Sequence, residues 1–442
     1  MPSGGDRSGE PARLRRRRFL AGVTSAILTA GAGCNQGGSS STPSPTDTEA
    51  FVDRPIEVLH GWTGGDGGQA IRSVERMFRA RHPDVSLDLR PVGGTGNENL
   101  NSAINRRLMN DNPPSSFATW PGPTLVRYEG ELLDVSGTWK TEAFTETIHP
   151  RVAQYCKFNG GYRAVPIGAH RLNTFFYRVE TLQSAGVDPT ELTSVKTLEA
   201  AFETIDRETD VVPLAHAMQA PWTNLQLVGQ TLLAQSDPDE YRQFVSGTVN
   251  RATLRRALET TKAILEQYIN EDASVISFTE ANRKFIRGEA AAIYQGSWVY
   301  GMYRNADSHE FGRDWEWIPF PGTGDSYVAN LDSFTFPRDN PTPQKKDVWA
   351  TFVGQSDPQI AFSNRKGSVP VRTDFDGDRL AAFPRVLWRD LQNADQLLPS
   401  LAHGLAVDPQ KLRACKSVIR DHFMEPFDVE QTADGLLAAL EK

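Results

Sequence analysis

Four of the nine tryptophans stand directly beside a glycine or proline, or directly after a Gly-Ser pair, where the packing of a helical core would not place them. Trp62 lies in a glycine-rich run, Trp120 precedes a Pro-Gly pair, Trp222 follows a proline and Trp298 follows a Gly-Ser pair. The face of an indole can cover the apolar C–H patch of a ligand ring. Each of these residues, taken alone, is equally well explained as a partly buried surface plug.

The glycine-rich run that contains Trp62 also carries an acidic residue, Asp66. The run separates a strand-like segment from a helix-like one, so Asp66 is expected at the N-terminus of a helix. A carboxylate at this position can accept hydrogen bonds from the hydroxyl groups of a ligand. It can equally serve as the plain N-cap of the helix, and both interpretations stay open.

The first 49 residues have the composition of an export signal followed by a tether. Arginines 15–18 lead into an apolar stretch that is too short to cross about 30 Å of hydrocarbon. Twin arginines before Phe-Leu are typical of the twin-arginine export type. Cys34 resembles a lipoprotein cleavage site, although Gly31 replaces the usual leucine. We therefore expect a signal peptide over 1–33, a lipidated Cys34 that opens a flexible tether over 34–50, and a location at the extracellular face of the cell membrane.

The rest of the chain is acidic and long enough for two or more domains. Six arginines against two acidic residues give residues 1–33 a charge of +4, so the remaining part of the chain, whose total is -8, carries -12. An acidic body disfavours nucleic acid and anionic membrane as partners. The expected contact with the membrane is therefore the lipid on Cys34 alone. About 390 residues are enough to bury a large core.

Two cysteines remain after Cys34, namely Cys156 and Cys415. In an exported chain they can form one disulfide or stay as two buried thiols, and their order does not decide between these states. No Cys/His spacing is typical of a zinc site, so neither a metal nor a cofactor is expected.

Strand-like and helix-like segments alternate along the body of the chain. The first three form a βαβ unit, which predicts a parallel sheet with helices on its faces. No internal repeat is present. The segments expected to be regular are strands at 55–60, 85–89, 117–120, 174–177 and 290–294, and helices at 71–78, 97–109 and 252–269.

A hairpin at Gly160-Gly161 leads into an extended apolar segment over 162–171 that contains proline and glycine. With this segment and its other landmarks, the chain resembles, over residues 55–430, the family 1 extracellular solute-binding proteins of ABC importers, in the branch that carries sugars. The other landmarks, in order, are Asp111-Asn112-Pro113-Pro114-Ser115-Ser116-Phe117, Phe285-Ile286-Arg287-Gly288-Glu289-Ala290-Ala291-Ala292, Gly296-Ser297-Trp298, Phe320-Pro321-Gly322-Thr323, Asp332-Ser333-Phe334 and Lys366-Gly367-Ser368-Val369-Pro370.

The resemblance implies an α/β fold of two lobes joined by crossing strands, with a ligand cleft between the lobes. Lobe one is then expected over 51–168 and 333–367, and lobe two over 169–332 and 368–442. It also implies a monomeric receptor that captures a sugar outside the cell, closes its lobes over it and delivers it to the subunits of an ABC permease. The nearest branch is the glucose- or galactose-binding type.

The same resemblance implies which residues contact the ligand. Asp332, Lys366 and His403 fall on family ligand positions, where they would supply an acceptor, a cationic donor and an imidazole. The four loop tryptophans fall on cleft positions, which favours stacking for at least two of them. His170, next to Arg171, is expected either at the ligand or at the hinge. The alternatives are a turn or cap role for Asp332, a solvated helix end for Lys366 and a structural role for His403.

Two departures from the glucose-binding branch bear on the identity of the sugar. Gly61-Trp62 stands where that branch has a Trp-Trp pair, and Ala118 and Trp120 stand where it has Gln and His. Compared with that branch, this chain offers fewer polar contacts and a larger aromatic face to the sugar. Another hexose, a pentose or a short oligosaccharide therefore remains open.

A glycoside hydrolase is the rival from another class, because carboxylates and aromatic rings in a cleft also describe sugar hydrolysis. Such an enzyme needs two carboxylates facing each other across one bond, and Asp66 with Asp332 would be the candidate pair. The chain carries no nucleophile elbow and no metal motif, which favours a binding protein over an enzyme. A binder of a non-sugar solute is the second alternative.

Overall fold

The computed structural model describes residues 54–65 and 67–441. The predicted signal peptide, Cys34, the tether and Asp66 lie outside the described residues. Within the two described ranges, no helix combines the length and the apolar character that crossing a membrane requires.

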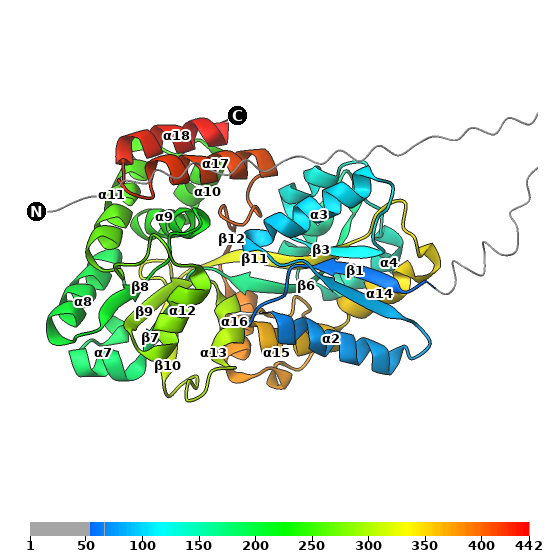
Figure 1. Cartoon of the computed structure of the whole chain (residues 1–442), viewed down its shortest axis with the longest axis horizontal. Helices are drawn as coiled ribbons and strands as arrows, with labels where there is room; N and C mark the ends of the chain where they lie inside the picture. The colour runs from blue at the N-terminus through cyan, green and yellow to red at the C-terminus, as the bar shows by residue number, and fades with distance from the viewer. Residues whose placement is uncertain (1–53, 66, 442) are drawn as a thin grey trace, which may run out of the picture. The chain divides into compact units, whose positions relative to one another are not determined.

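A six-stranded mixed sheet is the larger of the sheets (Figure 1). Its path runs β12-β11-β3-β1-β2, and β6 pairs with β11 beside that path. β1 is parallel to β2 and β3, whereas β11 is antiparallel to β3 and β6 and parallel to β12. The strands are β1 (Ile56–His60), β2 (Leu87–Pro91), β3 (Ser116–Thr119), β6 (Ala164–Arg171), β11 (Ser326–Thr335) and β12 (Gln396–Pro399).

A second sheet of four strands has the order β10-β7-β9-β8. β7 is antiparallel to β10 and β9, and β8 is parallel to β9. The prediction of a parallel sheet is therefore correct for β1 with its neighbours and for β8 with β9, and both sheets are mixed. The strands are β7 (Thr174–Arg178), β8 (Val212–Ala215), β9 (Ala290–Gln295) and β10 (Trp315–Pro319), and a small hairpin joins β4 (Lys157–Phe158) to β5 (Gly161–Tyr162).

The predicted βαβ unit is present, with α2 (Gly68–Arg81) as the crossover between β1 and β2. Ile71, Val74 and Phe78 of α2 are buried, because residues at this spacing share one face of a helix. That face packs against the first sheet, and α15 packs beside α2. Truncation of a buried phenylalanine such as Phe78 costs about 3–5 kcal/mol, so this face contributes much of the local stability.

Two long strands connect the sheets. β6 and β11 pair from Ala164↔Thr335 to Arg171↔Ala329, and every residue of both strands is buried. β6 leaves the first sheet and continues after a short turn as β7 of the second sheet. The extended segment predicted to cross between lobes is therefore β6, and β11 is its antiparallel partner. The predicted lobe boundaries within 51–442 stay a prediction.

Helices cover both sheets: five of them lie on the side of the first sheet that carries β1, β2 and β3, and the others lie toward the second sheet and the C-terminus (Figure 1). The five are α2, α3 (Glu98–Met109), α4 (Ser136–Thr141), α14 (Lys346–Gly354) and α15 (Ser356–Lys366). The others are α7 (Val179–Ala185), α8 (Val195–Glu208), α9 (Trp222–Gln235), α10 (Pro238–Ser246), α11 (Arg251–Gln267), α12 (Phe278–Arg287), α13 (Tyr300–Tyr303), α16 (Ala382–Asn393), α17 (Pro409–His422) and α18 (Val429–Glu441).

The remaining helical elements of the described residues are short turns. They are α5 (Phe144–Thr147), α6 (Pro150–Ala153), η1 (Thr95–Asn97), η2 (Gly122–Tyr128), η3 (Gln154–Cys156), η4 (Pro189–Glu191), η5 (Ser297–Val299), η6 (Pro343–Lys345) and η7 (Gly377–Arg379).

A capping box sets the beginning of α12. The Ser277 side chain accepts a hydrogen bond from the backbone N–H of Glu280, and the Glu280 carboxylate accepts one from the backbone N–H of Ser277. Such a reciprocal pair satisfies two N–H groups that a helix N-terminus leaves unpaired. The first residue of α12 is consequently Phe278, a position that matters for the site described below.

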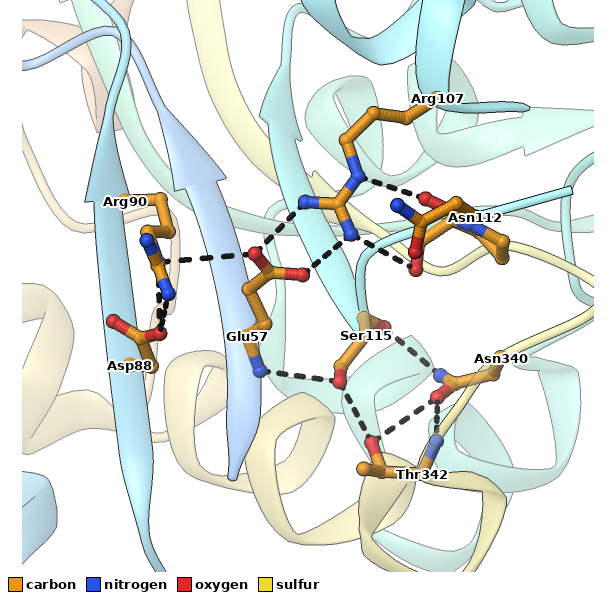
Figure 2. Close-up of polar contacts among 9 residues, drawn as sticks. Glu57, Asp88, Arg90, Arg107, Asn112, Ser115, Asn340 and Thr342 are labelled. Atoms are coloured by element: carbon orange, nitrogen blue, oxygen red, sulfur yellow. Dashed lines mark hydrogen bonds and ion pairs between the residues drawn. The ribbon is translucent and has the colours of Figure 1, made fainter. Parts of the chain in front are cut away.

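A polar network ties β1 to the beginning of β3 and to the segment after β11 (Figure 2). Arg107 of α3 donates two hydrogen bonds to the carboxylate of Glu57, at 2.8 and 2.7 Å. Ser115 Oγ accepts from Glu57 N–H at 3.1 Å and from Thr342 Oγ1 at 2.8 Å, while Asn340 Nδ2 donates to the Ser115 carbonyl at 2.8 Å. The Asp-Asn-Pro-Pro-Ser-Ser landmark thus lies in a network that aligns β1 with β3.

The two cysteines of the body are both free and buried, so the alternative of two buried thiols is the one found. Burial raises the pKa of the Cys415 thiol to about 12 and also raises that of Cys156. Both side chains therefore act as small apolar groups of the core.

Candidate ligand-binding site

Eight predicted ligand residues are within the described ranges, and all eight line one cavity of about 460 Å³. The ninth, Asp66, is not described. The cavity falls in the range of roughly 300–1,000 Å³ that is usual for small-molecule sites. The eight residues are Trp62, Trp120, His170, Trp222, Trp298, Asp332, Lys366 and His403.

The four tryptophans reach this cavity because each lies in the connection that follows the carboxyl end of a parallel strand or at the end of that connection. Trp62 follows β1 and Trp120 follows β3, while Trp222 lies beyond β8 and Trp298 beyond β9. Ligands of open α/β sheets bind outside the carboxyl ends of the strands. Two pairs of parallel strands, one from each sheet, therefore contribute one pair of tryptophans each.

Three of these tryptophans surround His403, which lies in the turn after β12. Its ring centroid is 5.4 Å from those of Trp120 and Trp222, and 5.0 Å from that of Trp298. Burial, together with the charges of Lys416 and His170, lowers the pKa of His403 to about 3. The imidazole is therefore neutral at physiological pH, with Nδ1 at 3.2 Å from Ser400 Oγ.

Trp62 belongs to a separate aromatic group at the same cavity. Its ring stacks on His60 with a centroid distance of 5.7 Å and meets Phe334 and Phe362 edge-on, at 5.7 and 5.1 Å. A Cβ at Gly67 would come within 2.8 Å of this indole, so the glycine-rich turn is needed for its close packing. Trp62 remains partly exposed, which leaves part of its surface for a ligand.

The crossing strands supply a buried acid and a buried imidazole. Asp332 Oδ2 of β11 lies 3.1 Å from His170 Nε2 of β6, and His170 Nδ1 lies 3.3 Å from Ser297 Oγ. Ser297 Oγ already accepts a hydrogen bond from the Arg171 N–H, so its hydroxyl hydrogen is free to be donated to His170 Nδ1. Because a carboxylate only accepts hydrogen bonds, Nε2 of His170 donates to Asp332 in the neutral and in the protonated ring alike, and this contact orients the carboxylate.

Lys366 is the last residue of α15 and is only 4% exposed, so the alternative of a solvated helix end is wrong. The helix ends because Gly367 takes the left-handed conformation, with φ of 80°. A Cβ at Gly367 would lie 2.2 Å from the Ser297 carbonyl oxygen. This glycine lets the end of α15 approach η5 closely, at the residue beside Trp298.

Two buried polar atoms of the cavity lining have no hydrogen-bond partner within the described part of the chain. They are Nε1 of Trp222 and Oδ1 of Asn330. A buried N–H or carbonyl without a partner costs about 1–3 kcal/mol. The site therefore presents one donor and one acceptor that a ligand can satisfy, and a hydroxyl group can serve as the partner of either.

A model of bacterial extracellular solute-binding proteins matches residues 76–383, which is more than half of the chain. The chain belongs to this family. The solute-binding protein is 48% identical over 389 residues to the xylose/arabinose-binding protein XacG of Haloferax volcanii, covering 88% of this chain and 85% of XacG.

More distant matches agree with this membership. The solute-binding protein is 28% identical over 421 residues to an uncharacterized ABC transporter extracellular-binding protein of Pyrococcus horikoshii, covering 94% of this chain and 93% of the other. Its fold is similar to that of the solved bacterial solute receptor AcbH, with a TM-score of 0.74 at 17% identity, covering 88% of this chain and 97% of AcbH. These findings confirm the two-lobed α/β fold and the choice of a binding protein over an enzyme.

Several residues that line the cavity of the solute-binding protein were not predicted. Asn330 lies two positions before Asp332 on β11, and side chains two apart share one face of a strand, so the spacing was a usable signal. Phe278, Thr279 and Arg283 of α12 also line the cavity. The capping box before Phe278 marks where this helix begins, but nothing in the sequence indicates that its first turn faces the ligand.

Proposed function

We propose that the solute-binding protein captures a pentose outside the cell and delivers it to the permease of an ABC importer. The name of XacG supports the pentose, because that relative is 48% identical and is named as a xylose/arabinose-binding protein. The uncharacterized relative from Pyrococcus horikoshii is named as part of an ABC transporter, which supports the partner. The permease subunits would recognise the closed form that the two lobes adopt around the sugar.

The observation that carries this proposal is the convergence of four indoles and a buried carboxylate on one cavity. Rings of Trp120, Trp222 and Trp298 would cover the C–H faces of a sugar, while Asp332 would accept hydrogen bonds from its hydroxyl groups. The Nε1 of Trp222 and the Oδ1 of Asn330 would pair with further hydroxyls. A solute without several hydroxyl groups would leave these polar atoms unsatisfied, which disfavours its binding.

The crossing strands support a hinge mechanism. Residues of the first sheet and residues of the second approach the same cavity, and β6 and β11 connect the two. A ligand that contacts both sides favours the closed arrangement by its differential affinity for it. His170 and Asp332 lie on the connecting strands themselves, so we place them at both the ligand and the hinge.

We further propose that the protein is exported by the twin-arginine route and held as a monomer at the extracellular face of the membrane through lipidated Cys34. The arginine pair followed by an apolar stretch and a cysteine supports this arrangement. Expression of the full chain and of Cys34→Ala, followed by fractionation, tests it. The wild type should sediment with membranes and the variant should appear in the medium; equal partition of both would contradict the anchor.

Calorimetry and tryptophan fluorescence with the mature protein test the sugar. Xylose and arabinose should bind with release of heat and a change in emission, and glucose and galactose should bind more weakly. Trp388→Ala serves as the control, because Trp388 packs on Phe375 outside the cavity and should leave affinity unchanged. No response to any pentose, hexose or short oligosaccharide would overturn the proposed function.

A further inference from the structure

A second cavity, of about 390 Å³, adjoins the ligand cavity and is strongly basic. Four cationic side chains line it, those of Arg127, Arg413, Lys416 and Arg420, and Glu98 is the one acidic residue among the described residues of its lining. This concentration of positive charge is unexpected on a chain whose formal net charge is -8. Clustered cations in a partly enclosed space repel one another, which calls for a stabilising partner.

The four cations come from two different parts of the fold. Arg127 lies on η2, which follows β3 of the first sheet. Arg413, Lys416 and Arg420 lie on α17, where their spacing of three and four residues places them on one face. α17 packs on α9 and α18, which belong with the second sheet, and also touches η2. The cavity is therefore bounded by both halves of the ligand-binding fold.

The charges inside this cavity are poorly compensated. Lys416 is 8% exposed, and its Nζ lies 3.8 Å from Glu98 Oε1, a long ion pair with an exposed carboxylate. The buried Nε of Arg127 has no hydrogen-bond partner within the described residues. Burial, reinforced by the charge of Arg413, lowers the pKa of Arg127, and burial lowers the pKa of Lys416 as well. Arg413 and Arg420 are exposed to solvent, so the poorly compensated charges are those of Arg127 and Lys416, with Glu98 as the one carboxylate among the described lining residues.

We propose that this cavity is an anion site for an oxyanion, either a free inorganic one or the carboxylate of an acidic sugar. Guanidinium groups bind carboxylate, phosphate and sulfate with charge-assisted hydrogen bonds, and the unpaired Arg127 Nε is such a donor. The anion neutralises the repulsion between η2 and α17. This inference extends the proposed function, and it holds whichever neutral sugar occupies the ligand cavity.

The anion site is coupled to the ligand cavity through shared walls. Gly96, Asn97 and Trp120 line both cavities. An anion that contacts Arg127 on one side and α17 on the other holds the two halves in the arrangement in which the ligand cavity is enclosed. By linkage, the anion and the sugar then strengthen each other's binding, and coupling of this kind is typically about 5- to 150-fold.

Sulfate is the probe for the free anion, with the mature protein and no sugar. Sulfate replaces chloride at constant ionic strength, and the melting temperature is recorded. It should rise with sulfate in the wild type, and the rise should fall by more than half in Arg127→Gln and in Lys416→Gln. Arg106→Gln is the matched control, because Arg106 is an exposed cation at the end of α3 that does not line this cavity. Equal responses in all four proteins would overturn the anion site.

Acidic sugars distinguish the two sources of the anion. Glucuronate is compared with glucose, and galacturonate with galactose, by calorimetry in chloride buffer. Tighter binding of the acids, lost in Lys416→Gln and kept in Arg106→Gln, identifies the carboxylate of the ligand as the occupant. A gain of about fivefold or more in the affinity of a neutral sugar on adding sulfate identifies the free anion instead.

The sulfate measurement contains no sugar, so it can succeed even if the proposed sugar function fails. Failure of both the sulfate and the acidic-sugar measurements, with a neutral sugar still bound, would overturn the anion site alone. Circular dichroism of each variant shows whether it is folded. If Lys416→Gln does not fold, Arg127→Gln still tests the anion site, because Arg127 is less buried than Lys416.

Discussion

His170 and Asp332 pair across the two strands that connect the sheets, with His170 Nε2 3.1 Å from Asp332 Oδ2. The pair is buried, at 2% and 5% exposure, and lies in the wall of the ligand cavity. A carboxylate held in this way is oriented before any ligand arrives, so little of the binding free energy is lost in ordering it.

Replacement of Asp332 by asparagine should weaken sugar binding by about 10- to 100-fold, because hydrogen bonds to a charged group contribute about 1.5–3 kcal/mol. The substitution keeps the shape of the side chain and removes its charge. Calorimetry with xylose measures the effect. Asp84→Asn changes an exposed carboxylate between α2 and β2 and should bind like the wild type. Wild-type affinity in Asp332→Asn would remove Asp332 from the ligand site.

Loss of an indole from the group around His403 should cost affinity as well. Trp298→Ala removes a ring that packs against both His403 and His170, and we expect a loss of affinity of up to about 10-fold, in line with roughly 0.5–1.5 kcal/mol for an aromatic contact. Trp62→Ala should weaken binding by several-fold to a thousandfold if the ring stacks on the sugar. Unchanged affinity in Trp62→Ala would identify that residue as a surface plug.

Gly367 should be required for the close approach of α15 to η5. Gly367→Ala places a Cβ 2.2 Å from the Ser297 carbonyl oxygen and also strains a backbone with φ of 80°. Gly186→Ala is the control, because Gly186 has a φ of 71° and no atom near its Cβ position. Both variants should lose about 1–2 kcal/mol of stability from the backbone alone. Only Gly367→Ala should also lose affinity for xylose, and equal affinities would contradict the role assigned to Gly367.

Much of the fold could be predicted because its elements carry periodic patterns. The helix over 71–78 and the strand over 55–60 were predicted from apolar spacing, and α2 and β1 lie there. Trp222 was predicted in a loop, and this was wrong because it is the first residue of α9. Every residue of α9 from Trp222 to Leu233 is buried, including the polar Asn224 and Gln226, so α9 has no solvent-exposed face and only a weak hydrophobic period to reveal a helix.

The candidate site was predicted in its aromatic part and missed in part of its polar lining. The four tryptophans stand directly beside a glycine or proline, or directly after a Gly-Ser pair, a signal that is visible in the sequence. Arg283, in contrast, lies on an ordinary surface-like helix, and only the packing of α12 brings it to the cavity. Which face of a helix meets a ligand depends on tertiary packing, which local periodicity does not encode.

Buried histidines should make the protein less stable in mild acid. Burial lowers the pKa of His309 to about 4, and neither ring nitrogen has a partner within the described part of the chain. Between pH 6.5 and 4 the unfolded chain binds a proton that the folded one does not, so stability is complete above pH 6.5 and is lost as the pH falls. His60, His216 and His403 act in the same direction.

Substitution His309→Leu should remove one share of this pH dependence. Urea unfolding measures the free energy of unfolding at pH 7 and at pH 5. The loss of this free energy between pH 7 and pH 5 should be smaller by about 2 kcal/mol in the variant than in the wild type. The ring lies among Phe285, Tyr303 and Trp315, which suit an aliphatic replacement. An unchanged difference would mean that His309 is protonated equally in the folded and unfolded chain.

Reducing agents should leave the stability of the body unchanged. Cys156 and Cys415 are free and buried, so thiol reagents should modify both after unfolding and neither before it. Mass spectrometry of the mature protein with and without denaturant measures this. A melting temperature that falls on reduction would instead indicate a disulfide.

The long antiparallel pairing of β6 with β11 has a consequence for how the chain can be divided. β11 pairs at one end with β12, from near the C-terminus, and at the other with β3, from near the beginning of the body. Neither half of the polypeptide, cut between β6 and β11, contains the complete six-stranded sheet. We therefore expect that the two fragments produced by one cut between β6 and β11 bind xylose only after they are mixed, because each lacks strands that the other supplies.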